Sequence, residues 1–213
     1  MEGAIFDQML TLTNARSLVI DLFFSLPKKI QHDHLHGKFF GWTPPPPSFI
    51  ELNSNASARG NPGFASAGGL LRDSNENWIS GFTRKIGFTT SLAAELWGLW
   101  DGLRLALSLN NEKIIVDVDA IAVVDLINAK HAETMQCHPY SVLLDDCREM
   151  IQCFEEAQLH HVVREGNHCA DLLAKAGNTS ILSFMFFRTP PSFVVSQLLV
   201  DYCGVTYPRL CNN

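Results

Sequence analysis

Residues 48–177 show an ordered succession of strand and helix patterns, and this order limits the folds that the chain can adopt. Three strand patterns come first, over 49–55, 65–72 and 78–87, separated by turn sequences rich in Gly, Asn, Asp and Pro. A long helix pattern follows over 89–109, with leucines recurring at helical spacing. Because the connections between the strands are short, the three strands are expected to form an antiparallel meander.

The second half of this segment alternates strands and helices. A β-branched strand over 113–119 precedes a short helix over 120–129 and a longer helix over about 139–156. A fifth strand over 159–164 and a final helix over 167–176 complete the pattern. The order β-β-β-α-β-α-α-β-α predicts an α/β fold with a five-stranded mixed sheet and helices on both faces.

A run of four prolines, Pro44–Pro47, favours extended polyproline geometry and predicts a domain boundary. We therefore expect an N-terminal extension with a proline-rich linker over 1–47, a main domain over 48–177 and a C-terminal tail over 178–213. The extension is apolar in pieces and includes a predicted helix around 4–24.

The composition favours an intracellular globular protein, in the cytoplasm or nucleus. Hydrophobic residues make up 46% of the chain and no apolar run reaches membrane-spanning length, so no membrane span is expected. The first residues lack the basic start of a signal peptide, so secretion is not expected. The six cysteines form no CxxC pair, which favours reduced thiols. We take the monomer as the starting assumption.

The charge balance predicts weak nucleic-acid binding. The formal net charge is −6, and residues 49–177 hold 10 Lys+Arg against 17 Asp+Glu, a balance of −7. Contacts between basic side chains and phosphates dominate the affinity for nucleic acid. Any such binding is therefore expected to be weak and sensitive to salt.

Three carboxylates stand at the ends of elements where active sites of such sheets collect. Glu95 lies in the first turns of the long helix, Asp119 ends a buried strand, and Asp171 lies early in the last helix. Three carboxylates brought together would repel one another unless a cation held them. Hydrolysis of a phosphodiester uses such a site, with two ions about 3.5–4 Å apart.

Each carboxylate also has an ordinary structural explanation. Glu95 would favour the dipole of its helix, Asp119 would cap the helix that follows, and Asp171 would be a surface residue of an amphipathic helix. Spacing and composition leave both explanations open.

Five segments in order carry a resemblance to a known family. They are LNSNASARGNPG (52–63), AGGLLRD (67–73), TTSLAAEL (89–96), IIVDVDA (114–120) and REGNHCADLLAKAG (164–177). Together they resemble the type 1 ribonuclease H family, and most of all its plant, retroelement-derived branch, often called reverse-transcriptase-like. The resemblance implies a ribonuclease H-like (RNase H-like) fold. It also implies endonucleolytic hydrolysis of the RNA strand of RNA–DNA hybrids, with Mg²⁺ or Mn²⁺ as cofactor.

The resemblance also assigns roles to the acidic positions. Glu95, Asp119 and Asp171 take three of the four metal-binding, catalytic positions of the family, and the first position falls on Asn55, where the family has Asp. An amide brings no negative charge to a cation, and its NH2 group cannot be a ligand. In addition, Ala56 replaces a family glycine. The metal site is therefore expected to be weakened.

The family contacts its substrate through a loop after the first strand and through positions near the first and last helices. The corresponding candidates for nucleic-acid binding are Gly60, Asn61, Pro62, Gly63, Thr90 and Asn167. By resemblance, the loop would meet the minor groove of the hybrid, where 2′-hydroxyls distinguish RNA from DNA. An ordinary hairpin turn explains the loop sequence equally well.

We therefore expect an RNase H-like protein of retroelement origin whose hydrolytic activity on RNA–DNA hybrids is weakened or lost. The competing hypothesis is a non-catalytic module that uses the same fold to contact nucleic acid or a protein partner. A third is a decayed element without a selected function.

Overall fold

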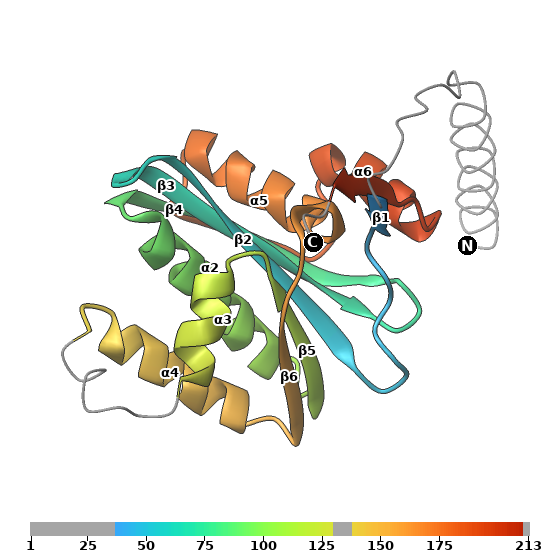
Figure 1. Ribbon diagram of the computed structural model, residues 1–213, viewed down its shortest axis with the longest axis horizontal. Helices are drawn as coiled ribbons and strands as arrows, with labels where there is room; N and C mark the ends of the chain where they lie inside the picture. The colour runs from blue at the N-terminus through green and yellow to red at the C-terminus, as the bar shows by residue number, and fades with distance from the viewer. Residues whose placement is uncertain (1–36, 130–137, 211–213) are drawn as a thin grey trace.

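The computed structural model describes residues 37–129 and 138–210, and a six-stranded mixed sheet forms its centre (Figure 1). The strand order across the sheet is β6-β5-β2-β3-β4-β7. Strands β2, β3 and β4 form the predicted antiparallel meander, and β5 and β6 continue the sheet parallel to β2. The strands are β2 Ile50–Gly60, β3 Gly63–Asp73, β4 Trp78–Thr89, β5 Lys113–Val118, β6 Glu156–His161 and β7 Phe184–Phe187.

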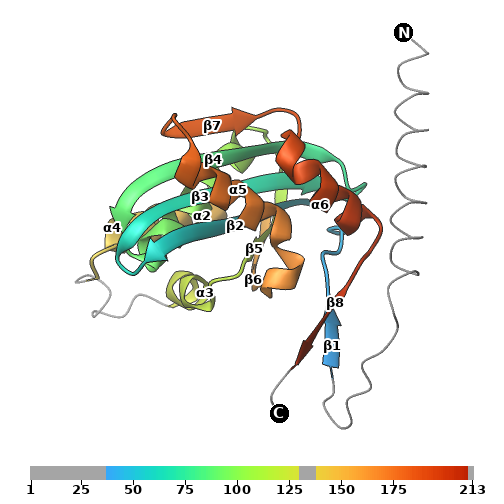
Figure 2. The same cartoon turned by 90° about the horizontal axis from the view of Figure 1, so that it is seen from above.

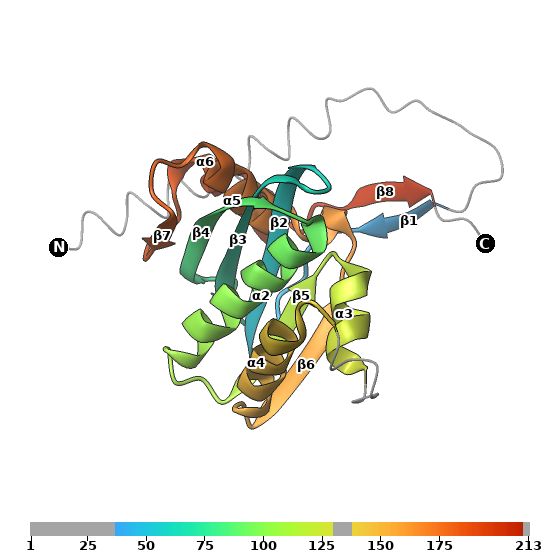
Figure 3. The ribbon, with the colours of Figure 1, turned by 90° about the vertical axis from the view of Figure 1, so that its left-hand side faces the viewer.

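Helices cover both faces of this sheet, as predicted. Figure 3 shows α2, α3 and α4 in front of the sheet and α5 and α6 behind it. The helices are α2 Ser91–Leu107, α3 Ile121–Asn128, α4 Ser141–Gln152, α5 His168–Thr179 and α6 Ser192–Tyr202, with a 3-10 turn, η2, at Arg164–Gly166. None of the helices in the described part of the chain is long and apolar enough to cross a membrane.

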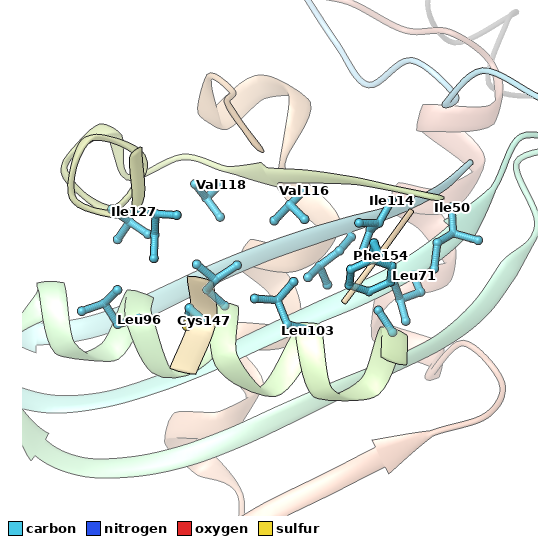
Figure 4. Packing of buried hydrophobic residues seen from close by; sticks show 14 of the residues in the cluster. Ile50, Leu71, Leu96, Leu103, Ile114, Val116, Val118, Ile127, Cys147 and Phe154 are labelled. Atoms are coloured by element: carbon cyan, nitrogen blue, oxygen red, sulfur yellow. The ribbon is translucent and has the colours of Figure 1, made fainter. Parts of the chain in front are cut away.

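The larger hydrophobic core lies between the sheet and α2, α3 and α4. Alternation along the strands sends Leu52 of β2 and Val116 of β5 to this side. Figure 4 shows Val116 in this core with Leu103 of α2 and Cys147 of α4. All four side chains are fully buried. A smaller core on the opposite face joins the sheet to α5 and α6, through Leu70, Cys169, Ala170, Leu173 and Val194.

Gly68 of β3 allows α5 to lie directly against the sheet. A Cβ at this position would stand 2.4 Å from the backbone nitrogen of Ala174 and from the carbonyl carbon of Leu173. No side chain other than hydrogen fits there. At Gly69 the neighbours are different, since a Cβ there would stand 2.7 Å from the ring of Phe82 and 2.8 Å from the carbonyl oxygen of Asn53.

The observed elements differ from the predicted ones in several bounds and in the number of strands. The fifth predicted strand, 159–164, begins three residues earlier as β6, because Glu156 pairs with Lys113 of β5 and its amide bonds to the carbonyl of Glu112. In addition, the segment predicted as a tail adds a sixth strand, β7, which pairs with β4.

The ends of the described chain pair with each other. Strands β1 (Gly37–Phe40) and β8 (Tyr207–Leu210) form a two-stranded antiparallel ribbon beside the main sheet (Figure 2). Both strands lie outside the predicted main domain. The helix predicted around 4–24 lies outside the described residues, and the boundaries at 48 and 177 stay predictions.

Candidate active site

The pairing of two parallel strands brings Asn55 and Asp119 together. β2 and β5 run in parallel with Ser54 opposite Val118, so the next residue of each strand lies at the same edge of the sheet. Asn55 is 2% exposed, and its Nδ2 donates a hydrogen bond to Oδ2 of Asp119 over 3.2 Å. Two positions of the predicted metal site, Asn55 and Asp119, therefore lie in contact. They meet through a hydrogen-bond donor and an acceptor, whereas two carboxylates would present two acceptors.

Glu95 joins this edge from the second turn of α2. Helix α2 begins at Ser91 because Thr90 caps it: Oγ1 of Thr90 accepts a hydrogen bond from the amide of Ala93 over 3.2 Å. Burial, and after it the negative charge of Asp119, raises the pKa of Glu95 to about 8. The carboxyl group of Glu95 is therefore mostly protonated at neutral pH.

Asp171 completes the group from the first turn of α5. Asn167 sets the start of this helix: it is 1% exposed, and its Nδ2 donates to the carbonyl of Ser54 over 2.9 Å. Burial is the main cause that raises the pKa of Asp119, and the charge of Asp171 adds to it. Asp171 also raises the pKa of Glu95, so all three predicted carboxylates act on one another.

Positive groups of the chain itself lie against these carboxylates. Lys175, one turn after Asp171 on α5, places its Nζ 2.5 Å from Oδ2 of that residue. Arg164 in η2 holds its Nε 3.9 Å from Oδ2 of Asp119. Each of the two aspartates thus has a cationic neighbour within the chain.

These residues do not form the metal site that the resemblance implies. Within 37–129 and 138–210, no three His, Cys, Asp or Glu side chains come close enough together to hold an ion. The amide of Asn55 turns a donor, not an oxygen, toward Asp119, and a cation repels such a group. The donor set as it stands therefore does not fit the two-ion centre of the family.

A cavity of about 360 Å³ opens beside Asp119 at the carboxyl ends of β5 and β6. Ligands of open α/β sheets bind at this end of the strands. Arginines from two separate elements line it: Arg164 from η2 and Arg209 from β8, the latter held by Glu165 over 3.2 Å. Their side chains are 72% and 47% exposed. The cavity thus offers guanidinium groups next to a candidate catalytic carboxylate.

The predicted substrate loop lies next to the start of α2. Gly60, Asn61 and Pro62 are exposed at the tip of the β2–β3 hairpin, and Gly63 is buried. Oδ1 of Asn61 accepts a hydrogen bond from the amide of Ser91 over 3.0 Å, which ties the loop to α2. The loop and the predicted backbone contact Thr90 therefore share one surface.

The other two polar candidates for nucleic-acid contact, Thr90 and Asn167, also have hydrogen-bond partners within the protein. Thr90 is partly buried and shares its Oγ1 between the α2 cap and the hydroxyl of Tyr140, 2.7 Å away. Asn167 lies inside the protein, so the structure gives it a supporting role at the start of α5. A direct contact of either residue with nucleic acid stays a prediction.

Sequence reasoning missed three cationic residues of this site. The sequence could have identified Lys175, because a spacing of four residues on a helix places this residue next to Asp171. Arg164 belongs to a matched motif and precedes the last helix. Arg209 could not be anticipated, since only the pairing of β8 with β1 brings this part of the tail beside Asp119.

The chain is similar to known proteins over most of its described length. Residues 53–177 match the model of the reverse transcriptase-like family. A protein of Arabidopsis thaliana whose name assigns it provisionally to the ribonucleases H is 34% identical over 172 residues. The match covers 81% of this chain and 27% of that protein. The chain therefore spans about a quarter of the length of this relative.

Solved structures share the fold. The RNase H1 of the archaeon Halobacterium salinarum superposes with a TM-score of 0.55 at 25% identity, covering 61% of this chain and 96% of that one. The N-terminal RNase H domain of a Mycobacterium tuberculosis protein gives 0.54 at 24% identity, covering 62% and 94%. An RNase H1 from compost metagenome, LC11, solved in complex with an RNA/DNA hybrid, gives 0.52 at 21% identity, covering 61% and 96%.

Proposed function

Because the chain belongs to the reverse transcriptase-like family with an RNase H-like fold, we propose that it binds RNA–DNA hybrids at the edge formed by Asn55, Asp119 and Asp171, and that it has weak or no hydrolytic activity. The resemblance makes Asn55 the position shared by both ions of the family. Loss of this charge is expected to lower activity by about 10²-fold or more, by analogy with the effect of losing groups around a metal site.

The observation that carries this proposal is the hydrogen bond from Nδ2 of Asn55 to Oδ2 of Asp119. An aspartate at position 55 would repel Asp119, and a bound cation would relieve this repulsion without protonation of either carboxylate. The amide satisfies Asp119 without a cation. Together with Lys175 on Asp171, it supports a site whose charge is balanced by the protein itself.

Binding of a hybrid is supported by the surface around this edge. The exposed hairpin tip lies against the start of α2, and Arg164 and Arg209 line the cavity next to Asp119. Guanidinium groups bind phosphate through paired hydrogen bonds. Moreover, the LC11 relative was solved with an RNA/DNA hybrid bound.

The test is a comparison of the native chain with Asn55→Asp on a labelled RNA–DNA hybrid in Mg²⁺ or Mn²⁺. We expect cleavage by the Asp variant at a rate about 10²-fold above that of the native chain, because the variant regains the missing charge. Asn55→Asp combined with Glu95→Gln is the control and should be inactive. Strong cleavage by the native chain, abolished by Glu95→Gln, would refute the loss of activity.

The same experiment tests the competing function of a non-catalytic module. If neither chain cleaves and the native chain still retards the hybrid in a binding assay, the protein is a nucleic-acid-binding module. If neither chain binds or cleaves the hybrid, the proposal as a whole fails and a protein partner becomes the alternative.

We also propose an intracellular location. The four cysteines in the described part of the chain, Cys147, Cys153, Cys169 and Cys203, are free thiols, as is usual in a reducing compartment. Microscopy of the chain carrying a fluorescent tag tests this location.

A further inference from the structure

A second cavity, of about 510 Å³, lies away from the candidate active site, between α2, β4 and β7. Its lining on α2 begins at Asp101 and includes Arg104, nine residues after Glu95. Nine residues of helix correspond to about 14 Å along the axis. The cavity also needs β7, which follows the segment 53–177 that matches the family. It is therefore not a part of the site described above.

The charge of this cavity is opposite to that of the whole chain. Arg84, Lys85 and Arg104 line it against a single carboxylate, Asp101. That carboxylate is occupied by Arg84, whose Nη1 lies 2.8 and 2.9 Å from its two oxygens. The lining therefore keeps a net positive charge, which comes from Lys85 and Arg104. A cluster of this sign in a chain of net charge −6 favours an anionic ligand.

Aromatic rings form the other wall. Phe184 and Phe186 alternate along β7, so both face the cavity, and they are 44% and 46% exposed. The ring of Phe184 is fixed by stacking on the buried Phe82, with 5.9 Å between centroids and 10° between planes. These rings offer flat apolar faces to a ligand.

We propose that this cavity binds a nucleotide of single-stranded nucleic acid, with a base on Phe186 and the adjoining phosphate on Arg104 and Lys85. Aromatic faces beside cationic groups are the combination that holds single strands, because every base has a face for stacking and every nucleotide carries a phosphate. Arg104 lines the cavity from α2, where it is exposed, and its guanidinium lies 4.6 Å from the centre of the Trp100 ring.

This inference does not need hydrolysis at the candidate active site, and it gives the protein a second contact with nucleic acid. The two contacts can therefore be measured separately, with a single strand for the cavity and a fully paired hybrid for the candidate active site.

The experiment measures the binding of a fluorescent single-stranded 12-mer by anisotropy, with the full chain and the variants Phe186→Ala and Arg104→Gln. Loss of a stacked base should weaken binding by about tenfold. Loss of Arg104 should also lower the salt dependence of log K by about 0.7. The matched controls are Phe39→Ala and Arg188→Gln, which alter an exposed Phe and an exposed Arg outside the cavity.

Each outcome has one meaning for the proposal. Selective weakening by Phe186→Ala and Arg104→Gln supports it, provided that thermal unfolding shows both variants to be folded. Equal effects of these variants and their controls overturn it, and so does the absence of binding by the native chain. Binding of AMP with no binding of the strand also overturns it, in favour of a free nucleotide. Failure of the paired hybrid to bind concerns only the proposed function.

Discussion

At position 55, replacing one carboxylate oxygen of an aspartate with the NH2 group of Asn55 turns a hydrogen-bond acceptor into a donor. An aspartate there could only accept hydrogen bonds and would add a third negative charge beside Asp119 and Asp171. Asn55 donates to Asp119 instead, and the edge remains folded around it with 2% of the residue exposed. The fold can thus persist without the carboxylate, because an amide is nearly isosteric with it.

The resemblance identified Asn55, Glu95, Asp119 and Asp171, and the structure brings the four to one edge of the sheet. Their separate explanations as surface or capping residues fail for Asp171, which is 9% exposed, and for Asp119, which makes no side-chain cap to α3. What the sequence could not show is the direction of the Asn55 amide. The register between β2 and β5 places the amide beside Asp119, and the carboxylate there accepts a hydrogen bond from the NH2 group.

The raised pKa of Glu51 predicts how the free energy of unfolding depends on pH. Burial raises its pKa from an ordinary 4.5 to about 8, while the charge of Arg72 opposes the rise. Between these two values the unfolded chain releases the proton that the folded protein retains. The contribution of Glu51 to the free energy of unfolding should therefore be fully present below pH 4.5, decrease as the pH rises toward 8 and change little above it.

The variant Glu51→Gln should flatten this dependence, because its side chain stays neutral at every pH. Urea unfolding between pH 5 and 8 measures it, with Glu149→Gln, at an exposed position on α4, as the control. A slope equal to that of the native protein would contradict the assignment. Some slope should remain, since the pKa of Glu95 is also raised.

At the scale of elements, α2 was the easiest to predict and β7 the hardest. The helix has leucines at helical spacing and a Thr at its cap, so pattern and capping agree. The strand is only four residues long, Phe-Met-Phe-Phe, and shows no alternation of polar and apolar residues. Pairing with β4, about 100 residues earlier in the chain, defines it as a strand, and local sequence does not report such pairing.

Helix α6 is held to the sheet by a buried ion pair. Arg72 of β3 is 1% exposed, and its Nη1 lies 2.7 Å from Oδ2 of Asp201 on α6. The guanidinium also lies 3.6 Å from the centre of the Trp42 ring. Residues before and after the predicted main domain therefore converge on one arginine inside the sheet.

The variant Asp201→Asn should destabilise the protein strongly, because it leaves the charge of Arg72 buried without its partner. The loss of a partner in a buried pair costs roughly 3–5 kcal/mol. Urea unfolding measures the change, with Asp125→Asn, at an exposed position on α3, as the matched control. A loss below about 1 kcal/mol, the usual range for exposed pairs, would show that Arg72 finds another partner or reaches water.

For the whole molecule, the structure suggests a folding unit larger than the predicted domain 48–177. The sequence predicts the smaller unit, since the proline run looks like a boundary and the five segments of the resemblance end at Gly177. Nevertheless, Trp42 is 6% exposed and its Nε1 donates to Oε2 of the buried Glu51 over 2.5 Å. On the other side, α6 covers Cys169 and Leu173 through Val194.

A chain of residues 48–177 should therefore unfold at a lower temperature than one of residues 37–210. The shorter chain loses Trp42 and Asp201 together, and the unpaired Arg72 alone is expected to cost roughly 3–5 kcal/mol. Circular dichroism during heating compares the two chains. Equal midpoints would show that the extensions rest on a domain that is complete without them.

The ribbon of β1 and β8 has a mechanical consequence. Gly37 pairs with Leu210 at one end of the ribbon and Phe40 with Tyr207 at the other, so the chain enters and leaves the described fold at neighbouring points. If the chain were pulled at the segments before Gly37 and after Leu210, the force would act first on the Gly37–Leu210 pair. The strand pairs of the ribbon would then separate one after another. The six-stranded sheet would carry no load until the ribbon had opened. The ribbon would thus separate under a lower force than the one needed to unfold the sheet.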